Sequence, residues 1–258
     1  MYLDNKDKIF IDDILDKIEY IEQHNIVDYR KLYTHTDELE QQNYLKYFYR
    51  QPKSNYFKQN WYGLVNEYCI QRDVKRFWIV LWWKDILDCW AYIWDSSIAF
   101  SDQFSDSKVY AIEASPINIH KLQEVISLHK KSSQIIPINV WVWDKDKKWY
   151  ISDEWIWSRI STTGVSIQIR SIDSLVDEYN LNPWLIKRDI EWFEYESLLG
   201  TIETIKKYKP ILLISVYHNW KDLFEAKKLL QELDIGYRFT FTRWDSMTPF
   251  SDTLLVCY

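Results

Sequence analysis

Short apolar, β-branched runs alternate with helical stretches from about residue 75 to the end of the chain. The runs read ILDC, VYAIEAS, IIPINVWV, LIKRDI and ILLISVY. Continuous apolar runs of this length are typical of strands buried on both faces, and a helix between successive strands implies right-handed crossovers. The pattern therefore predicts an α/β fold with a mostly parallel, doubly wound sheet.

The last two apolar runs, YRFTFTR and TLLVCY, are joined by the short loop WDSMTPFSD, with no helical stretch between them. A connection of this kind predicts an antiparallel hairpin at one edge of the sheet. Residues 146–170 form another irregular stretch, in which we expect an inserted hairpin before the sheet resumes. No repeat, linker or low-complexity tract divides residues 75–258, which we predict to be one domain.

Residues 1–74 differ in character, because charged residues, Gln and Tyr are interspersed with apolar residues at helical spacing, as in IFIDDILDKIEYIEQ. This pattern predicts a helical N-terminal extension, whose function the sequence does not indicate. The first residues do not show a basic segment followed by an apolar run, and no apolar stretch is long enough to span a bilayer. We expect a cytoplasmic protein.

Composition narrows the function. The chain has 258 residues, of which 47% are hydrophobic, and this is ample material for a core. A net charge of -6 argues against a nucleic-acid partner. Cys69, Cys89 and Cys257 match neither a metal-binding nor a disulfide spacing, so we expect reduced thiols. Because the sequence shows no metal cage, we also expect a metal-independent enzyme.

Glycine is scarce and tryptophan abundant. The chain has 4 Gly and 15 Trp, whereas average usage predicts about 18 Gly. Several tryptophans stand in polar, turn-like contexts that favour glycine, namely NVWVWDKD, DEWIWSRIS, DIEWFE and YHNWKDL. The segment ILDCWAYIWDSSIAF likewise places Trp in a strand–turn–helix junction, where nucleotide-binding folds use glycine.

Six segments together resemble the FkbM family of S-adenosylmethionine-dependent methyltransferases, in the family's order. They are ILDCWAYIWDSSIAF, VYAIEASPINIHKL, NVWVWDKD, IRSIDSLVDEY, LIKRDIEWFEYESLLG and KYKPILLISVYH. The resemblance implies a class I, Rossmann-like methyltransferase fold, S-adenosylmethionine as cofactor, and O-methylation of a sugar hydroxyl on a glycan or glycosylated metabolite. We expect acceptor specificity to reside in residues 1–70 and 146–165, outside the recognisable core.

The sequence departs from the family where tryptophan replaces glycine, at Trp90, Trp94 and Trp192; Trp143 and Trp157 raise the same question. Neighbouring motif residues are intact. One hypothesis is that these codons are UGA, which some bacterial lineages read as glycine. The alternative is that the tryptophans are genuine and fill the cofactor loop, which would leave a non-catalytic Rossmann-like binding or scaffold protein.

The first strand–turn–helix junction is the expected site of the cofactor's amino-acid portion. Backbone N–H groups and a helix N-terminus approach the ligand there, and the approach favours residues without Cβ. By resemblance Asp88, Ala91 and Asp95 match the motif. Asp88 would act on the ammonium group or on structured water, whereas Asp95 would either polarise the pocket or cap the helix. As written, Trp90 and Trp94 would fill space meant for the ligand.

The adenosine portion is expected at the next two strand ends. Glu113 ends the second strand, where an acidic side chain can accept hydrogen bonds from both ribose hydroxyls. Alternatively, it is a solvated residue before a helix that Ser115 caps and Pro116 starts. The resemblance places Asn139 and Val140 beside the adenine, although an apolar strand end can also be core. A nicotinamide-dependent enzyme is disfavoured, because even restored glycines would be too widely spaced.

The acceptor should lie at the carboxyl ends of the later strands. Lys187, Asp189 and Glu191 alternate along the fourth strand and its exit, so all three could point to one face. They form either a structural ion pair or a tuned acid/base site. His218, after ILLISVY, is the candidate general base for an acceptor hydroxyl, or else a structural hydrogen-bonding residue.

Overall fold

A computed structural model of the protein describes residues 12, 16, 84–92, 95–152, 159–161, 164–243 and 253–258. Asp12 and Asp16 are helical and exposed. The remainder of the expected N-terminal extension lies outside the described residues, as do Cys69, Trp94 and Trp157.

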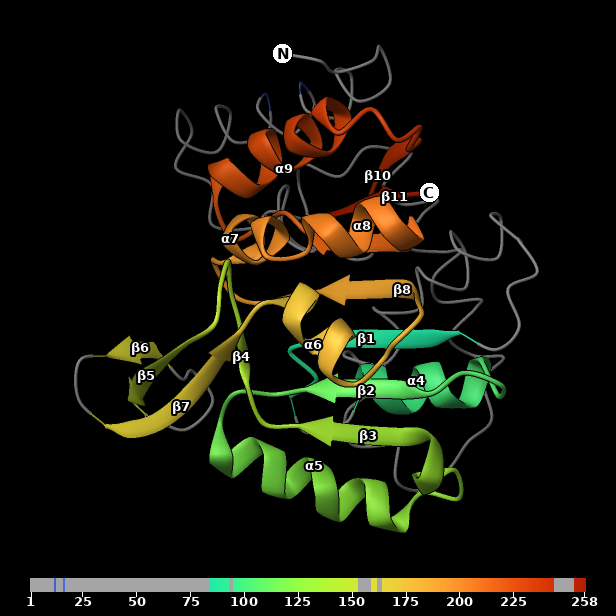
Figure 1. The fold of residues 1–258 in the computed structure, drawn as a ribbon, viewed down its shortest axis with the longest axis vertical. Coiled ribbons are helices and arrows are strands. Elements are labelled where there is room, and N and C mark those ends of the chain that lie inside the picture. Colours follow the sequence, from blue (N-terminus) through green and yellow to red (C-terminus); the bar gives the residue numbers. More distant parts are fainter. Residues whose placement is uncertain are drawn as a thin grey trace.

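The predicted sheet is present and has seven strands in the order β10-β11-β9-β8-β1-β2-β3 (Figure 1). Strand β1 pairs in parallel with β2 and β8, and β2–β3 and β8–β9 are also parallel. Strand β11 is antiparallel to both β9 and β10, which confirms the predicted edge hairpin. The strands are β1 Asp85–Cys89, β2 Val109–Ile112, β3 Ile135–Ile138, β8 Pro183–Arg188, β9 Ile211–Ser215, β10 Phe239–Arg243 and β11 Thr253–Cys257.

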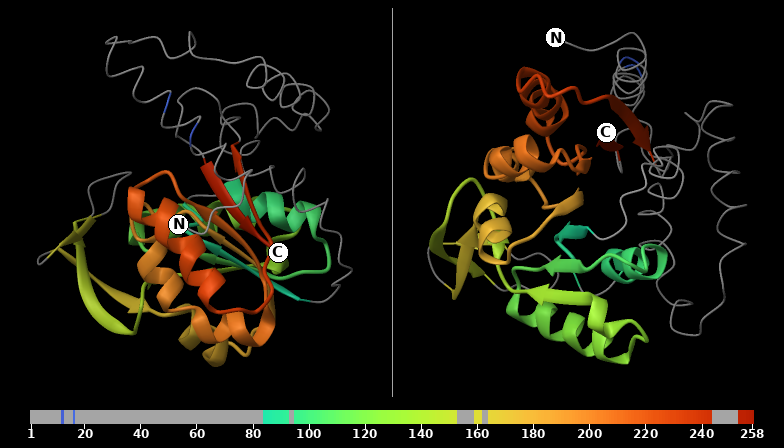
Figure 2. Two further views of the ribbon diagram at one scale, coloured as in Figure 1. Left: turned by 90° about the horizontal axis from the view of Figure 1, so that it is seen from above. Right: turned by 45° about the vertical axis from the view of Figure 1, so that its right-hand side comes forward.

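Helices cover both faces of this sheet. In Figure 2 the helices α7, α8 and α9 lie on one side of the sheet and α4 lies on the other. Side chains along each strand alternate between the two faces, so Leu87 packs in one core cluster and its neighbour Ile86 in another. The helices are α4 Asp95–Gln103, α5 Pro116–Leu128, α6 Ile172–Glu178, α7 Glu194–Leu199, α8 Ile202–Tyr208 and α9 Trp220–Glu232, with a 3-10 turn at Ser132–Gln134.

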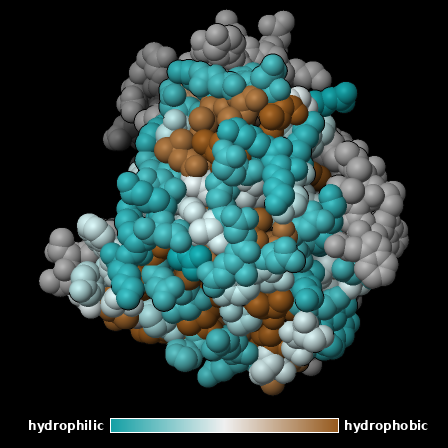
Figure 3. Space-filling view, in the orientation of Figure 1, coloured by the Kyte–Doolittle hydropathy of each residue, from teal (hydrophilic) through white to brown (hydrophobic). Residues whose placement is uncertain are grey.

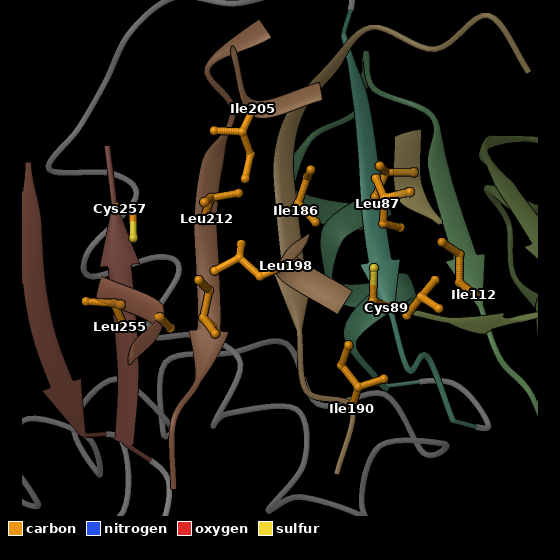
Figure 4. Close-up of a cluster of buried hydrophobic side chains, with 14 of the residues drawn as sticks. Leu87, Cys89, Ile112, Ile186, Ile190, Leu198, Ile205, Leu212, Leu255 and Cys257 are labelled. Carbon is orange, nitrogen blue, oxygen red and sulfur yellow. The ribbon is translucent and has the colours of Figure 1, made fainter. Parts of the chain in front are cut away.

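The larger core cluster lies between the sheet and helices α6 to α9 (Figure 4). Leu198 of α7 and Ile205 of α8 pack there, both with no exposed surface. Two thiols, Cys89 of β1 and Cys257 of β11, are buried in the same cluster and are free. The expectation of reduced cysteines is therefore confirmed for these two residues.

A second sheet, in the order β4-β7-β5-β6, extends from the side of the first (Figure 1). Its strands are β4 Trp141–Val142, β5 Lys147–Ser152, β6 Arg159–Ser161 and β7 Val165–Arg170. Strand β5 is antiparallel to β6 and to β7, which confirms the hairpin expected within 146–170.

Asp146 ties the second sheet to the start of α6. Its carboxylate accepts hydrogen bonds from the Ser171 amide at 2.8 Å, the Ser174 hydroxyl at 2.7 Å and Arg170 Nε at 2.8 Å. Although burial opposes ionisation, these hydrogen bonds and the Arg170 charge lower the pKa of Asp146. The ionised carboxylate is thus a fixed junction between β5, β7 and α6.

The turn between α7 and α8 touches the second sheet through Gly200. A Cβ at this position would lie 2.1 Å from the carbonyl oxygen of Trp143, so only glycine allows the two backbones to approach. The face drawn in Figure 3 is mostly hydrophilic, with smaller hydrophobic areas between. Within the described ranges, no helix is both long and apolar enough to cross a bilayer.

Candidate active site

The carboxyl ends of β1, β2, β8 and β9 carry most of the residues that the sequence singled out, and open α/β sheets bind ligands at this edge. Two groups form there. The first surrounds the β1 turn and the end of β2, and the second follows β8 and β9.

Asp88, near the end of β1, is fully buried and holds the next helix in place. Its Oδ2 accepts hydrogen bonds from the hydroxyls of Ser96 and Ser97 at 2.6 and 2.5 Å. Its Oδ1 lies 3.4 Å from Lys187 Nζ and has no hydrogen-bond partner within the described part of the chain. In this structure, Asp88 therefore organises the turn and the start of α4.

Lys187 belongs to this first group. Besides the ion pair with Asp88, its Nζ donates a hydrogen bond to the carbonyl of Trp90 at 3.2 Å. Asp189 and Glu191 instead contact His218. The three residues therefore make different direct contacts, and the expectation that they point to one face stays a prediction.

The turn after β1 has a left-handed backbone, with φ of 73° at Trp90 and 50° at Tyr92. The amides of Trp90 and Ala91 both donate to the carbonyl of Ile112 at 2.9 Å, and Ala91 is fully buried. The Trp90 ring packs edge-on against Trp141 at 5.4 Å. A left-handed conformation strains a residue with a Cβ, so the backbone at position 90 favours the glycine of the motif.

Two further motif positions are only partly defined. Asp95 is the first residue of α4, but its side chain lies outside the described parts, and so does the whole of Trp94. Whether Asp95 caps the helix or faces the cofactor stays a prediction.

Glu113 follows β2 and is 1% exposed. Its Oε1 accepts from the Ser115 amide at 2.8 Å and its Oε2 from the Tyr92 amide at 3.0 Å. Burial raises the pKa of Glu113 to about 7, against the hydrogen bonds of Ser115, Asn118 and Tyr92. Each carboxylate oxygen has two acceptor positions, so these amide hydrogen bonds leave acceptor capacity for a ribose.

Helix α5 begins as the sequence predicted, with Ser115 as its cap and Pro116 as its first residue. The Ser115 hydroxyl accepts from the Asn118 amide at 3.3 Å, and Pro116 occupies the first turn. The helix cap and a buried Glu113 therefore coexist.

Asn139 and Val140, which follow β3, lie in different surroundings: the Asn139 side chain is hydrogen-bonded and Val140 is a core residue. The Asn139 side-chain amide donates to the carbonyls of Glu113 and Ala114, both at 2.9 Å, and so lies beside the end of β2. Val140 is 6% exposed and packs in the larger core cluster. The burial of Val140 favours its core role, and a role for Asn139 beside the adenine stays a prediction.

The second group is the carboxylate–His218 cluster, which comprises Asp189, Glu191, Glu194 and His218. The His218 Nδ1 lies 2.7 Å from Glu194 Oε1. On the other side of the ring, Nε2 lies 3.4 Å from Glu191 Oε2 and 3.7 Å from Asp189 Oδ1. The side chains of His218 and Glu194 are 5% and 0% exposed, whereas those of Asp189 and Glu191 are 27% and 25% exposed.

Burial and the neighbouring charges shift the pKa values of His218 and Glu191. Burial opposes the charged imidazole, but the hydrogen bond and charge of Glu194, with the charges of Asp189 and Glu191, raise the pKa of His218 to about 9. Burial is the main reason that the pKa of Glu191 rises to about 7. His218 is thus mostly protonated at neutral pH in this arrangement, which disfavours the neutral imidazole that a general base requires.

Sequence reasoning missed Glu194 and Asp222. Glu194 begins α7 and also accepts from the Ile190 amide at 2.9 Å, and Asp222 near the start of α9 accepts from the Tyr195 amide at 2.9 Å. Burial and the neighbouring Glu194 raise the pKa of Asp222 to about 7. Glu194 lies in the segment LIKRDIEWFEYESLLG, one turn after Glu191, and that position was its only signal; Asp222 lies outside the six family segments.

A sharp turn aims Glu191 at the imidazole. Both Glu191 and Trp192 have left-handed backbones, with φ of 52° and 84°, and Trp192 is 60% exposed. Position 192 is another family glycine that the sequence replaces with tryptophan, and its backbone favours glycine as position 90 does. Arg188, the last residue of β8, is fully buried and donates to the Ser197 hydroxyl at 2.8 Å.

This sheet order, with its antiparallel final strand and an acidic residue after β2, defines a class I S-adenosylmethionine-dependent methyltransferase fold. The sequence matches the methyltransferase FkbM domain over residues 88–239. The chain therefore belongs to the FkbM methyltransferase family.

The chain is also similar to solved structures. A methyltransferase FkbM from Methylobacillus flagellatus KT is 21% identical with a TM-score of 0.57, and the match covers 86% of this chain and 60% of that one. A putative caffeoyl-CoA O-methyltransferase from Staphylococcus aureus is 15% identical with a TM-score of 0.46, over 94% of this chain and 98% of that one. No curated protein matches the chain.

The buried Glu113 at the end of β2, with its remaining acceptor capacity, fits the ribose of S-adenosylmethionine, the cofactor of this fold. The left-handed turn at residue 90 fits the close backbone approach that the amino-acid portion needs, provided that no side chain intervenes.

Proposed function

We propose that the protein transfers a methyl group from S-adenosylmethionine to a sugar hydroxyl of a glycan or a glycosylated metabolite. One observation carries the proposal: the carboxylate–His218 cluster lies at the carboxyl ends of β8 and β9, and β8 pairs directly with β1, whose end forms the cofactor turn. An acceptor held by the cluster would therefore be next to the cofactor.

In this proposal, Glu113 binds the ribose hydroxyls and Asn139 lies beside the adenine. Asp88 acts mainly by positioning, because it fixes Ser96 and Ser97 at the start of α4 while Lys187 balances its charge. Asp95 remains a candidate neighbour of the amino-acid portion.

The cofactor supplies an electrophilic methyl group on a sulfonium. An acceptor oxygen forms the new O–C bond while the C–S bond breaks, and the electron pair of that bond stays on sulfur. Asp189 and Glu191 are the partly exposed members of the cluster, so they are placed to hold the hydroxyl and to receive its proton. Alignment of the oxygen with the methyl group supplies most of the catalysis.

The test compares the chain as written with a Trp90→Gly, Trp94→Gly, Trp192→Gly variant. Isothermal titration with S-adenosylmethionine measures cofactor binding, and transfer of a radiolabelled methyl group to a panel of glycans measures activity. We expect the variant to bind the cofactor at least about tenfold more tightly, because a Cβ no longer obstructs the turn.

Absence of cofactor binding in both proteins would contradict the proposal. That outcome would favour the alternative, a non-catalytic binding or scaffold protein, for which Trp90 packed on Trp141 is the supporting contact. A cytoplasmic location stays a prediction.

A further inference from the structure

One buried nitrogen in the cluster lacks the partner that its surroundings require. His218 Nε2 has no hydrogen-bond partner among the described residues, although the side chain is only 5% exposed. Buried polar atoms are almost always hydrogen-bonded or bound to an ion or water. This nitrogen instead points between Glu191 Oε2, at 3.4 Å, and Asp189 Oδ1, at 3.7 Å.

The other ring nitrogen is already fixed. At 2.7 Å, His218 Nδ1 and Glu194 Oε1 are at hydrogen-bonding distance, which holds the ring so that Nε2 faces the two exposed carboxylates. A carboxylate that holds the remote nitrogen of an imidazole is the usual support of a metal-binding histidine. Tyr217 holds the Asp189 carboxylate in place, because its hydroxyl donates to Asp189 Oδ1 at 3.2 Å.

The distances from His218 Nε2 to the oxygens of Glu191 and Asp189 suit atoms that bind one ion. Metal–ligand distances of about 2.0–2.2 Å place neighbouring ligand atoms roughly 3–3.5 Å apart. The 3.4 and 3.7 Å separations around Nε2 are close to that range. Single ligand atoms of Asp189, Glu194 and His218 also lie within 4.8 Å of one another, which places Glu194 in the same cluster.

We propose that Asp189, Glu191 and His218 bind one divalent transition-metal cation, with Glu194 as the residue that positions His218. Carboxylate oxygens suit Mn²⁺ and an imidazole nitrogen suits Zn²⁺, so this mixed set of ligands fits either cation. The cation would also neutralise the excess of carboxylates. The metal-independent enzyme expected from the sequence rested on the lack of a recognisable metal-binding pattern, and ligands that follow two different strands form no such pattern.

The role of the cation rests on the proposed function. A hydroxyl bound to a divalent cation loses its proton near neutral pH more readily than a free hydroxyl. With the cation bound, Asp189 and Glu191 would act on the acceptor hydroxyl through the cation, which would favour loss of the hydroxyl proton and so activate the oxygen.

Mn²⁺ is the probe, because its solution EPR signal weakens when it binds protein. The full chain, first treated with EDTA and then desalted, is titrated with Mn²⁺ alone. We expect one ion per chain, with binding weakened about tenfold or more by Glu191→Gln and by Asp189→Asn. Glu203→Gln is the matched control, since Glu203 is exposed and pairs with Lys206 at 2.9 Å; it should leave the affinity unchanged.

Thermal midpoints confirm that each variant is folded. Lack of stoichiometric Mn²⁺ binding, or equal affinities in Glu191→Gln, Asp189→Asn and the original chain, would overturn the metal site. Titration of S-adenosylmethionine in EDTA separates the two proposals: cofactor binding without Mn²⁺ binding overturns the metal site alone, and Mn²⁺ binding without cofactor binding overturns the proposed function alone.

Discussion

At the scale of single residues, the tryptophans of this chain are not equivalent. Trp184 is a core residue, 9% exposed, whose Nε1 donates to the Ser107 hydroxyl at 3.1 Å. Trp90 and Trp192 instead occupy left-handed turns where the family has glycine. The left-handed backbone therefore supports the hypothesis that glycine belongs at 90 and 192. At 184, the burial and the hydrogen bond of the indole ring support tryptophan.

Trp192→Gly should raise the free energy of unfolding by about 1 kcal/mol, because the left-handed backbone no longer strains a Cβ and the 60% exposed ring packs little. Urea unfolding measures the change. Trp192→Ala is the matched control, since it removes the ring but keeps the Cβ, and it should give no comparable gain. Equal stabilities of the Gly and Ala variants would contradict the explanation.

Glu113 should make cofactor binding dependent on pH. Its pKa is raised from 4.5 to about 7, so the protonated form accumulates as the pH falls below about 7 and one ribose acceptor is lost. We expect affinity for S-adenosylmethionine to fall between about pH 8 and about pH 6. Calorimetry measures it, and Glu113→Gln should bind more weakly with a flat profile over that range. A sloping profile in Glu113→Gln would assign the dependence to another group.

At the scale of elements, the apolar runs predicted the strands because each is buried on both faces, and burial leaves a continuous hydrophobic signal. Strand alternation applies only to extended backbone. Strand β8 ends at Arg188 and Glu191 has a left-handed φ, so alternation does not determine where the Glu191 side chain points. Glu194 and Asp222 were invisible for another reason. Helices α7 and α9 bring them to the site, and no local pattern records that contact.

Gly200→Ala should destabilise the fold by about 2 kcal/mol or more, because the added Cβ would lie 2.1 Å from a backbone oxygen that cannot move independently. Chemical denaturation measures the loss. Gly236→Ala is the control: its φ is +76°, but the added Cβ would meet only Lys209 Nζ, at 3.6 Å. It should lose about 1 kcal/mol. A smaller loss at 200 than at 236 would show that the α7–α8 turn shifts freely.

At the scale of the whole molecule, the main sheet provides the two strand-end groups and the second sheet is attached beside them through Asp146. Residues 146–165 were expected to influence acceptor choice, and this attachment gives that expectation a structural basis. The attachment of the second sheet to α6 could not be predicted from the sequence, because the hydrogen bonds of Asp146 join segments that are about 25 residues apart.

Asp146→Ala should loosen the second sheet while sparing the first. It removes acceptors for the Ser171 amide, the Ser174 hydroxyl and Arg170. Hydrogen exchange should rise in β5 and β7 and stay low in β1 and β8. Glu178→Ala, which removes the other, half-exposed partner of Arg170, is the control and should change little. Uniform exchange across both sheets would mean that they open as one unit.

The two thiols of the main core have a practical consequence. Burial raises the pKa of Cys89 to about 12 and raises that of Cys257 further, so neither forms a thiolate in the folded protein at neutral pH. An alkylating reagent can modify them only when β1 or β11 separates from its neighbours. Mass spectrometry can measure the rate at which each thiol is labelled. The rate for Cys89 reports how often the sheet opens at its centre, and the rate for Cys257 reports how often it opens near its edge.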